Sequence, residues 1–179
     1  FEHDYPRLAA MLAAGGLPAF AAERGACIEA GDPLVVLGGV AVFMNPEPLA
    51  PFADLMVIGE AEAVLEPLMA LLKEALGADR APLLAQIATS LAGCYVPGLY
   101  RFLTDGQGLL RSIEAVPGAP KRVQKVIAPP MAQAAHSTLL SPRAELGMYM
   151  VELGRGCSRG CRFCAAGFIY RPPRLWSAE

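Results

Sequence analysis

The sequence predicts an α/β protein whose N-terminal part is one half of an open, doubly wound parallel sheet. Two short apolar runs, residues 33–37 and 55–58, are typical of buried strands. Each run ends at a glycine, and segments of helical composition lie before, between and after the two runs. Strands that alternate with helices in this way form parallel sheets with helices on both faces.

Three helices are expected around these strands. Asn45 is a suitable N-cap for the second, because a proline follows it directly. The third is the longest, with acidic residues in its first turn, which suit the helix dipole, and Gly77 at its end. The expected helices cover residues 5–14, about 45–52, and 60–76.

The middle of the chain is expected to be rich in β structure. Residues 99–103 and 109–113 flank a short run that contains Asp105 and two glycines, a pattern that predicts a hairpin. Residues 121–127 are a further candidate strand. The proline-rich and small residues of 128–145 indicate an irregular crossover.

The C-terminal part contains the most specific chemical signal. An apolar run at 148–153, which predicts a buried strand, is followed by Cys157, Cys161 and Cys164 in the spacing C-x-x-x-C-x-x-C. Three thiolates within eight residues can surround one metal site but cannot complete a four-ligand shell. The sequence therefore predicts a site that binds something further, in a loop after a strand, where α/β barrels place their active sites.

Other interpretations of the three cysteines meet specific objections. A structural zinc site needs a fourth ligand, for which Cys94 and His136 are the only remote candidates. An electron-transfer cluster needs four neighbouring cysteines, and the odd number of cysteines argues against a disulfide framework. Cys27 and Cys94 are expected to be indifferent or buried thiols, and His136 a surface histidine.

Residues 152–172, with the three cysteines, the preceding glycines and Phe163, resemble the first strand and cluster loop of radical S-adenosylmethionine (SAM) enzymes. The resemblance implies a TIM-type barrel and a 4Fe–4S cluster on Cys157, Cys161 and Cys164. It also implies SAM on the fourth iron, with Phe163 near its adenine or shielding the cluster. Reductive cleavage of SAM would give a 5′-deoxyadenosyl radical for hydrogen abstraction. An external electron donor such as flavodoxin or ferredoxin is implied as partner.

The N-terminal part is similar to the cobalamin-binding-type, Rossmann-like domain that precedes the barrel in one subgroup of this family. The similarity rests on residues 22–25, 38–39, 45–48 and 57–62. It implies cobalamin contacts and cobalamin-linked methyl transfer or rearrangement. The Asp-x-His-x-x-Gly pattern of methionine-synthase-like domains is absent around His3, and an alanine replaces one of the subgroup's usual glycines. The implied contact residues are Gly38, Gly39, Gly59 and Glu60.

Charge and composition leave a second enzyme class open. Residues 1–78 carry 3 basic and 11 acidic residues, whereas 79–179 carry 12 basic and 6 acidic residues. The basic excess could stabilise an anionic cluster and the SAM carboxylate, or form a nucleic-acid patch with Lys121, Arg122 and Lys125. An RNA-modifying radical SAM protein without cobalamin is therefore an alternative, as is a non-catalytic iron–sulfur or zinc module.

The predicted organisation has three parts. Residues 1–78 form the partial cobalamin-binding-type domain, 79–145 a linker with a β-hairpin, and 146–179 the start of a truncated radical SAM domain. A barrel of this type needs about 200 residues or more, so the chain is expected to be an inactive internal fragment. With 54% apolar residues it should be globular, and with neither a secretory signal nor a long apolar run it should be cytoplasmic and without membrane contact.

Overall fold

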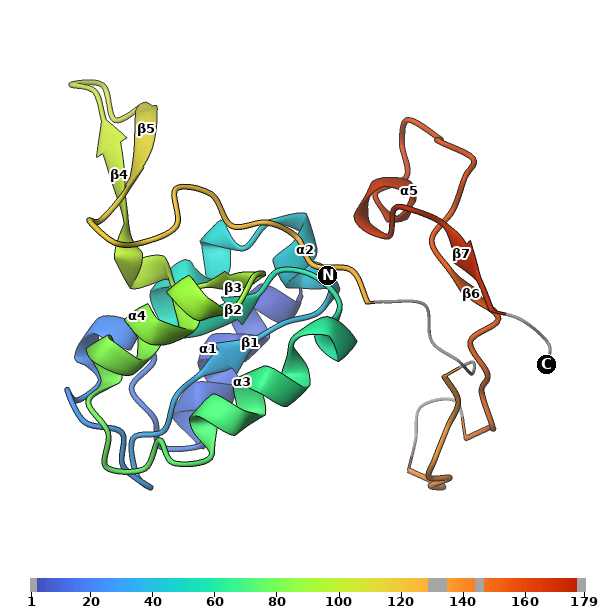
Figure 1. The fold of residues 1–179 in the computed structure, drawn as a ribbon, viewed down its shortest axis with the longest axis horizontal. Helices are drawn as coiled ribbons and strands as arrows, with labels where there is room; N and C mark the ends of the chain where they lie inside the picture. Colours follow the sequence, from blue (N-terminus) through green and yellow to red (C-terminus); the bar gives the residue numbers. More distant parts are fainter. Residues whose placement is uncertain (1–2, 129–134, 144–146, 177–179) are drawn as a thin grey trace. The chain divides into compact units, whose positions relative to one another are not determined.

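The computed structural model describes residues 3–128, 135–143 and 147–176 (Figure 1). The chain forms two compact units, Phe1–Ala128 and Pro129–Glu179. Of the expected crossover, residues 129–134, which include the Pro129-Pro130 pair, and residues 144–145 lie outside the described residues. None of the helices in the described part of the chain is both long enough and apolar enough to cross a membrane.

The first unit is built on a three-stranded sheet in the order β1-β2-β3 (Figure 1). β1 (Val36–Leu37) and β2 (Leu55–Val57) run parallel, as the two apolar runs suggest. β3 (Cys94–Tyr95) pairs antiparallel with β2, with Met56 opposite Tyr95. The sheet of the described residues is therefore mixed, and a Rossmann-like class for the complete domain stays a prediction.

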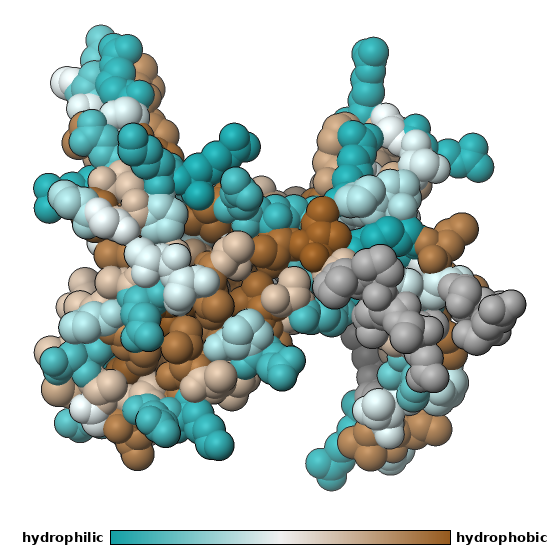
Figure 2. Space-filling view, viewed as in Figure 1, coloured by the Kyte–Doolittle hydropathy of each residue, from teal (hydrophilic) through white to brown (hydrophobic). Residues whose placement is uncertain are grey.

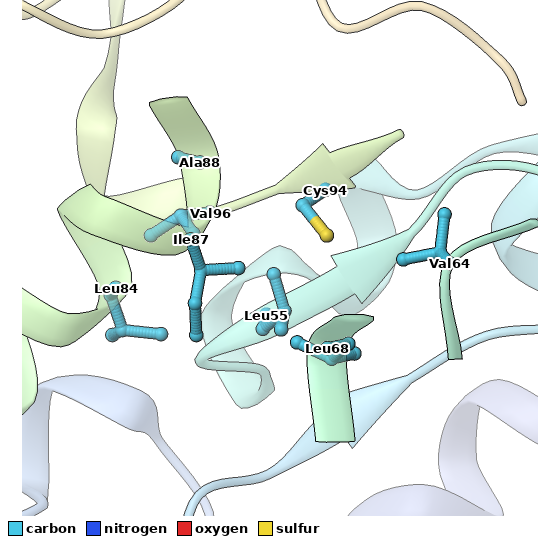
Figure 3. Close-up of a cluster of buried hydrophobic side chains, with 8 residues drawn as sticks. All are labelled: Leu55, Val64, Leu68, Leu84, Ile87, Ala88, Cys94 and Val96. Atoms are coloured by element: carbon cyan, nitrogen blue, oxygen red, sulfur yellow. The ribbon is translucent and has the colours of Figure 1, made fainter. Parts of the chain in front are cut away.

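Helices pack on both faces of this sheet. Successive residues of a strand point to opposite faces, so neighbouring residues of β2 contact different helices. Leu55 packs with side chains of α3 and α4 in one core cluster (Figure 3). Met56, the next residue, packs with Tyr95 and with side chains of α2 and η2, while α1 covers that cluster from outside. The helices and 3₁₀ segments of this unit are α1 (Asp4–Ala14), η1 (Ala21–Glu23), α2 (Val40–Met44), η2 (Glu47–Phe52), η3 (Ala61–Ala63), α3 (Leu65–Leu72), α4 (Arg80–Ser90) and η4 (Pro97–Leu99).

The first expected helix is confirmed, the second forms as the 3₁₀ segment η2 with Pro46 and not Asn45 at its N-cap, and the third is interrupted. Instead of one helix over 60–76, the chain forms η3 and then α3. Pro67 explains the break, because a proline lacks the amide hydrogen and its ring collides with the carbonyl four residues earlier. Beginning the helix at Leu65 places Pro67 in the first turn, where a proline is tolerated.

The core continues past the expected boundary at residue 78. α4 was not predicted, and β3 lies at the start of the stretch, 93–127, that was expected to be rich in β structure. Leu84, Ile87 and Cys94 lie in the same cluster as Leu55 (Figure 3). The missed signal was an apolar spacing of three and four residues along α4, which Asp79 precedes at the N-cap. Residues 79–96 thus belong to the packed body of the first unit.

The predicted hairpin is confirmed as β4 (Tyr100–Thr104) and β5 (Leu110–Ala115). The Asp105 carboxylate accepts hydrogen bonds from the amides of Gln107 and Leu109, both at 2.9 Å, and so closes the turn. The hairpin extends away from the sheet (Figure 1), and its surface carries both hydrophilic and hydrophobic residues (Figure 2). Most of its side chains are exposed.

The second unit has little regular structure. β6 (Gly154–Arg155) pairs antiparallel with β7 (Arg174–Leu175), and α5 (Ala166–Ile169) lies between them. The expected strand at 148–153 forms only one bridge, between Val151 and His136, and its apolar side chains are exposed instead of buried. No element in the described part of this unit packs over them, so the predicted burial is wrong for this chain, and the barrel stays a prediction.

Candidate functional site

The three cysteines of the C-x-x-x-C-x-x-C motif occupy one loop between β6 and α5. Cys157 and Cys164 are half-buried, Cys161 is exposed, and all three are free thiols. The Cys164 amide donates to the Cys161 carbonyl at 3.1 Å, which makes the last part of the loop a tight turn. All three sulfur donors therefore come from one short segment, as the spacing predicts.

The thiols do not converge on a common point. Among the described residues, no group of three or more His, Cys, Asp or Glu side chains is placed to hold a metal ion. Neutral thiols gain little from contact with one another, and thiolates repel, so a cation is needed to draw them together. The donor chemistry nevertheless fits an iron–sulfur cluster, because soft thiolate ligands select it.

The glycines around the first cysteine allow a close approach of the returning chain. Gly156 has φ of +93°, and an added Cβ there would lie against the Tyr170 carbonyl oxygen and 2.9 Å from the Pro173 Cα. An added Cβ at Gly154 would lie 2.7 Å from the Arg174 carbonyl oxygen. These glycines therefore serve contact with the segment that follows α5.

Beside this loop is a polar cavity of about 420 Å³. Arg155 donates to both oxygens of Glu152, at 2.7 and 2.9 Å, and both side chains line the cavity together with Tyr170. A bidentate pair of this kind fixes the guanidinium in one orientation. Arg155, one of the cations in the basic excess of residues 79–179, is thus already engaged by a carboxylate.

The other residues predicted near the cluster are open to solvent. Phe163 is 92% exposed and has no packing partner in the described part of the chain. The Arg171 guanidinium lies 4.5 Å from the centre of the Phe168 ring and 3.6 Å from a Cβ added at Gly160. One cation of the predicted basic excess therefore lies against the cysteine loop.

The predicted cobalamin contacts at the first strand end remain accessible. Gly39 has φ of +86° and precedes α2, and a Cβ added to it would meet no atom within 4 Å. A Cβ added at Gly38 would meet only the Val57 Cβ, at 4.0 Å. The backbone at this turn therefore has space beside it.

The second strand end is covered by another part of the chain. Val126 forms a parallel bridge with Gly59, its amide donating to the Ile58 carbonyl and its carbonyl accepting from the Glu60 amide, both at 3.0 Å. Gly59 has φ of +136°, and an added Cβ would lie against the Val126 carbonyl oxygen. The Glu60 carboxylate, buried at 3% exposure, accepts from the Ala128 amide at 2.8 Å. Contacts within the chain therefore explain both the need for a glycine at position 59 and the burial of the Glu60 carboxylate.

The remaining cysteines and His136 have different surroundings. Cys94 is 2% exposed in the core, and burial raises the pKa of its thiol to about 11. Cys27 is exposed, and its hydrogen bond to the Asp79 carboxylate, at 3.5 Å, raises its pKa. His136 is exposed, and its Nδ1 lies 3.1 Å from the Ser137 carbonyl. For both Cys27 and Cys94, the neutral thiol is therefore favoured over the thiolate.

A buried ionic network that was not predicted from the sequence lies at the start of β2. The Asp54 carboxylate accepts from Arg24 at 2.8 Å and from the Val35 amide at 2.7 Å, and Arg80 lies 3.3 Å from its other oxygen. Asp54 and Arg80 also line a cavity of about 520 Å³ with mostly apolar walls. The available signal was an aspartate directly before an apolar strand, with arginines isolated in acidic surroundings.

Comparison with known proteins gives one family and one relative. The family described as "Radical SAM proteins, N-terminal" matches residues 1–97. The "Uncharacterized protein MJ0966" of Methanocaldococcus jannaschii is 49% identical over 41 residues, which is 21% of this chain and 9% of that protein. The chain thus matches only a small part of that relative's length. No solved structure matches this chain.

Proposed function

Because this chain belongs to the radical SAM family through its N-terminal domain, we propose that Cys157, Cys161 and Cys164 bind a 4Fe–4S cluster that serves SAM cleavage. The observation that carries the proposal is the presence of three free thiols on one short loop in a chain of this family. When bound, such a cluster supplies the electron that splits SAM into methionine and a 5′-deoxyadenosyl radical, which abstracts hydrogen from a substrate.

The surrounding residues have distinct proposed roles. Gly156 lets the chain after α5 pack against the start of the cysteine loop, which limits the positions that Cys157 can take. Arg155, held by Glu152, presents a fixed cation beside the loop, where the carboxylate of SAM would bring negative charge. The exposed ring of Phe163, next to Cys164, would exclude water from a bound cluster or contact the adenine of SAM.

Cobalamin is not part of this proposal. Gly38 and Gly39 leave space for a ligand, but Gly59 and Glu60 are engaged by Val126 and Ala128. A corrinoid at that strand end would have to displace these contacts. We therefore expect the purified chain, incubated with hydroxocobalamin and passed through gel filtration, to retain no corrinoid absorption.

The complete enzyme would abstract hydrogen from a substrate and take electrons from a flavodoxin- or ferredoxin-like donor in the cytoplasm. The exposed apolar run at 148–153 would then be covered by further barrel strands. An RNA substrate is the second candidate, and the observation that favours it is the pair of exposed cations Lys121 and Arg122.

Anaerobic reconstitution with iron and sulfide tests the cluster proposal. The 179-residue chain should bind about four iron and four sulfide ions, and its reduced form should give a 4Fe–4S EPR signal. The triple variant C157A/C161A/C164A should bind none. The double variant C27A/C94A is the matched control, because neither thiol belongs to the loop, and it should retain the full iron content.

The outcome decides between the candidate sites. Equal iron in the wild-type chain and the triple variant would contradict the proposal, as would loss of the cluster in the C27A/C94A control. A single zinc ion bound in place of iron and sulfide would indicate a non-catalytic metal module. In a chain that contains the complete barrel, added SAM should change the shape of the EPR signal.

A further inference from the structure

A separate cavity of about 290 Å³ lies in the first unit, at the end of β2. It lies between η2, β3, the base of the hairpin and the segment around residues 121–123. In open α/β sheets, the carboxyl ends of parallel strands are where ligands bind. The residues that matter for its chemistry are Glu47, Ile58, Tyr95, Tyr100, Lys121 and Arg122.

The inner wall of this cavity is held in place by hydrogen bonds. Tyr95 is 6% exposed, and its hydroxyl donates to Glu47 Oε1 at 3.0 Å. The Tyr100 hydroxyl donates to the Pro120 carbonyl at 2.7 Å, and the two tyrosine rings are 5.2 Å apart. The hydrogen bond from Tyr100 to Pro120 anchors the segment that carries Lys121 and Arg122. The aromatic wall of the cavity is therefore connected directly to its charged rim.

The charges at the rim favour an anion. Lys121 and Arg122 are exposed, and neither makes an ion pair within the described part of the chain. Among the described residues that line the cavity, Glu47 is the only acidic one, and its carboxylate already accepts a hydrogen bond from the hydroxyl of Tyr95. An ammonium and a guanidinium side by side are a common arrangement for binding phosphate.

We propose that this cavity binds a nucleotide, with its phosphate at Lys121 and Arg122 and its base against the wall of Tyr100 and Ile58. The volume lies just below the range of about 300–1,000 Å³ that is usual for small-molecule sites, which suits a ligand no larger than one nucleotide. Aromatic walls with adjacent cations are also how proteins bind single-stranded nucleic acids. The nucleotide can therefore be free or part of an RNA strand. The inference does not depend on the cysteine loop.

Calorimetric titration of the 179-residue chain, with its cysteines reduced and metal-free, tests this site. AMP and UMP are the free probes, a single-stranded hexaribonucleotide is the polymer probe, and adenosine and inorganic phosphate are partial probes. We expect a nucleotide to bind more tightly than either partial probe. K121A/R122A should weaken binding about tenfold or more, because charged hydrogen bonds are lost.

Two further variants make the result decisive. E47Q keeps an acceptor for the Tyr95 hydroxyl but removes a negative charge, so it should tighten nucleotide binding several-fold. R7A/K73A removes the same number of charges from exposed positions that do not line the cavity and should leave affinity unchanged. Thermal melts would confirm that each variant folds.

Each outcome has a defined meaning. Binding of the RNA alone, with the same response to the variants, would identify RNA as the source of the nucleotide. The proposal is overturned by absence of binding to all nucleotide probes, or by equal losses in K121A/R122A and R7A/K73A. Weaker binding in E47Q would also overturn it, because it would indicate a cationic ligand.

Discussion

The two units of this protein differ in what holds them together. The first has packed side chains on both faces of β2, with Leu55 and Met56 at 0% exposure. In the second, Leu153 and Leu175 are 77% and 87% exposed, and Phe163 is 92% exposed. Side-chain packing therefore defines the first unit, whereas backbone pairing and glycine contacts define the second. The apolar residues that direct folding therefore lie in the first unit, whereas the cysteine motif lies in the second.

Replacing Asp54 should have the largest effect and unfold the first unit most readily. D54A leaves Arg24 buried without its carboxylate and the Val35 amide without its acceptor, whereas Arg80 keeps Asp32 at 3.2 Å. Removing one partner of a buried ion pair costs about 3–5 kcal/mol. Urea unfolding followed by circular dichroism measures the loss.

The matched control for D54A is E152A in the second unit. The Glu152–Arg155 pair is part-exposed, and its removal should change the unfolding free energy of the first unit by less than about 0.5 kcal/mol. Similar losses in both variants would contradict the contrast between the units.

Substitution of Gly59 should cost about 3 kcal/mol. G59A combines an unfavourable φ of +136° with a collision between the new Cβ and the backbone of Val126. At Gly93 an added Cβ would instead meet the Val126 side chain, at 2.7 Å. V126A should therefore partly rescue G93A but not G59A. Unfolding midpoints in urea test this, and equal rescue of both would refute the assigned contact.

Stability of the first unit should fall in alkaline solution because of Cys94. Its pKa is raised from 9.0 to about 11, so the folded state holds the thiol proton more tightly than the unfolded state. The contribution is present in full below pH 9 and is lost as the pH rises through about 11, and it amounts to about 3 kcal/mol. C94V should show a flatter decline between these pH values in urea titrations, and an identical slope would exclude this thiol as the cause.

The smallest effect is expected from the cysteine loop. In reducing, metal-free buffer, C157A/C161A/C164A should melt like the wild-type chain, within about 0.5 kcal/mol, since none of the three thiols belongs to a core cluster. A clear loss of stability in calorimetry would mean that the second unit supports the first.

The sequence predicted those elements whose causes are local. The hairpin follows from turn residues beside Asp105, and α1 from its composition and Gly15. The break before Leu65 was overlooked although Pro67 signals it. The roles of Asp54 and Glu60 could not be predicted, because their partners lie far away in sequence, as Ala128 does for Glu60.

The sequence predicted where the candidate site lies along the chain but not how its side chains are arranged. The spacing of Cys157, Cys161 and Cys164 places them on one loop, and they lie there. The spacing does not indicate whether the three sulfur atoms converge on one point, because convergence requires the charge of a bound metal. At Gly59, a glycine that looked suited to a ligand instead meets the chain's own backbone. Local sequence does not distinguish these two uses of a glycine.

The contacts of Val126 with Gly59 and Glu60 also bear on how the domain is made. The family match ends at residue 97, but hydrogen bonds from Val126 and Ala128 complete the end of β2. During synthesis, the first unit can reach its final form only after residue 128 has left the ribosome. The compact unit Phe1–Ala128 is therefore longer than the segment by which its family is recognised, and a chain shortened to residue 97 would expose the amide of Glu60 and the buried side of Gly59.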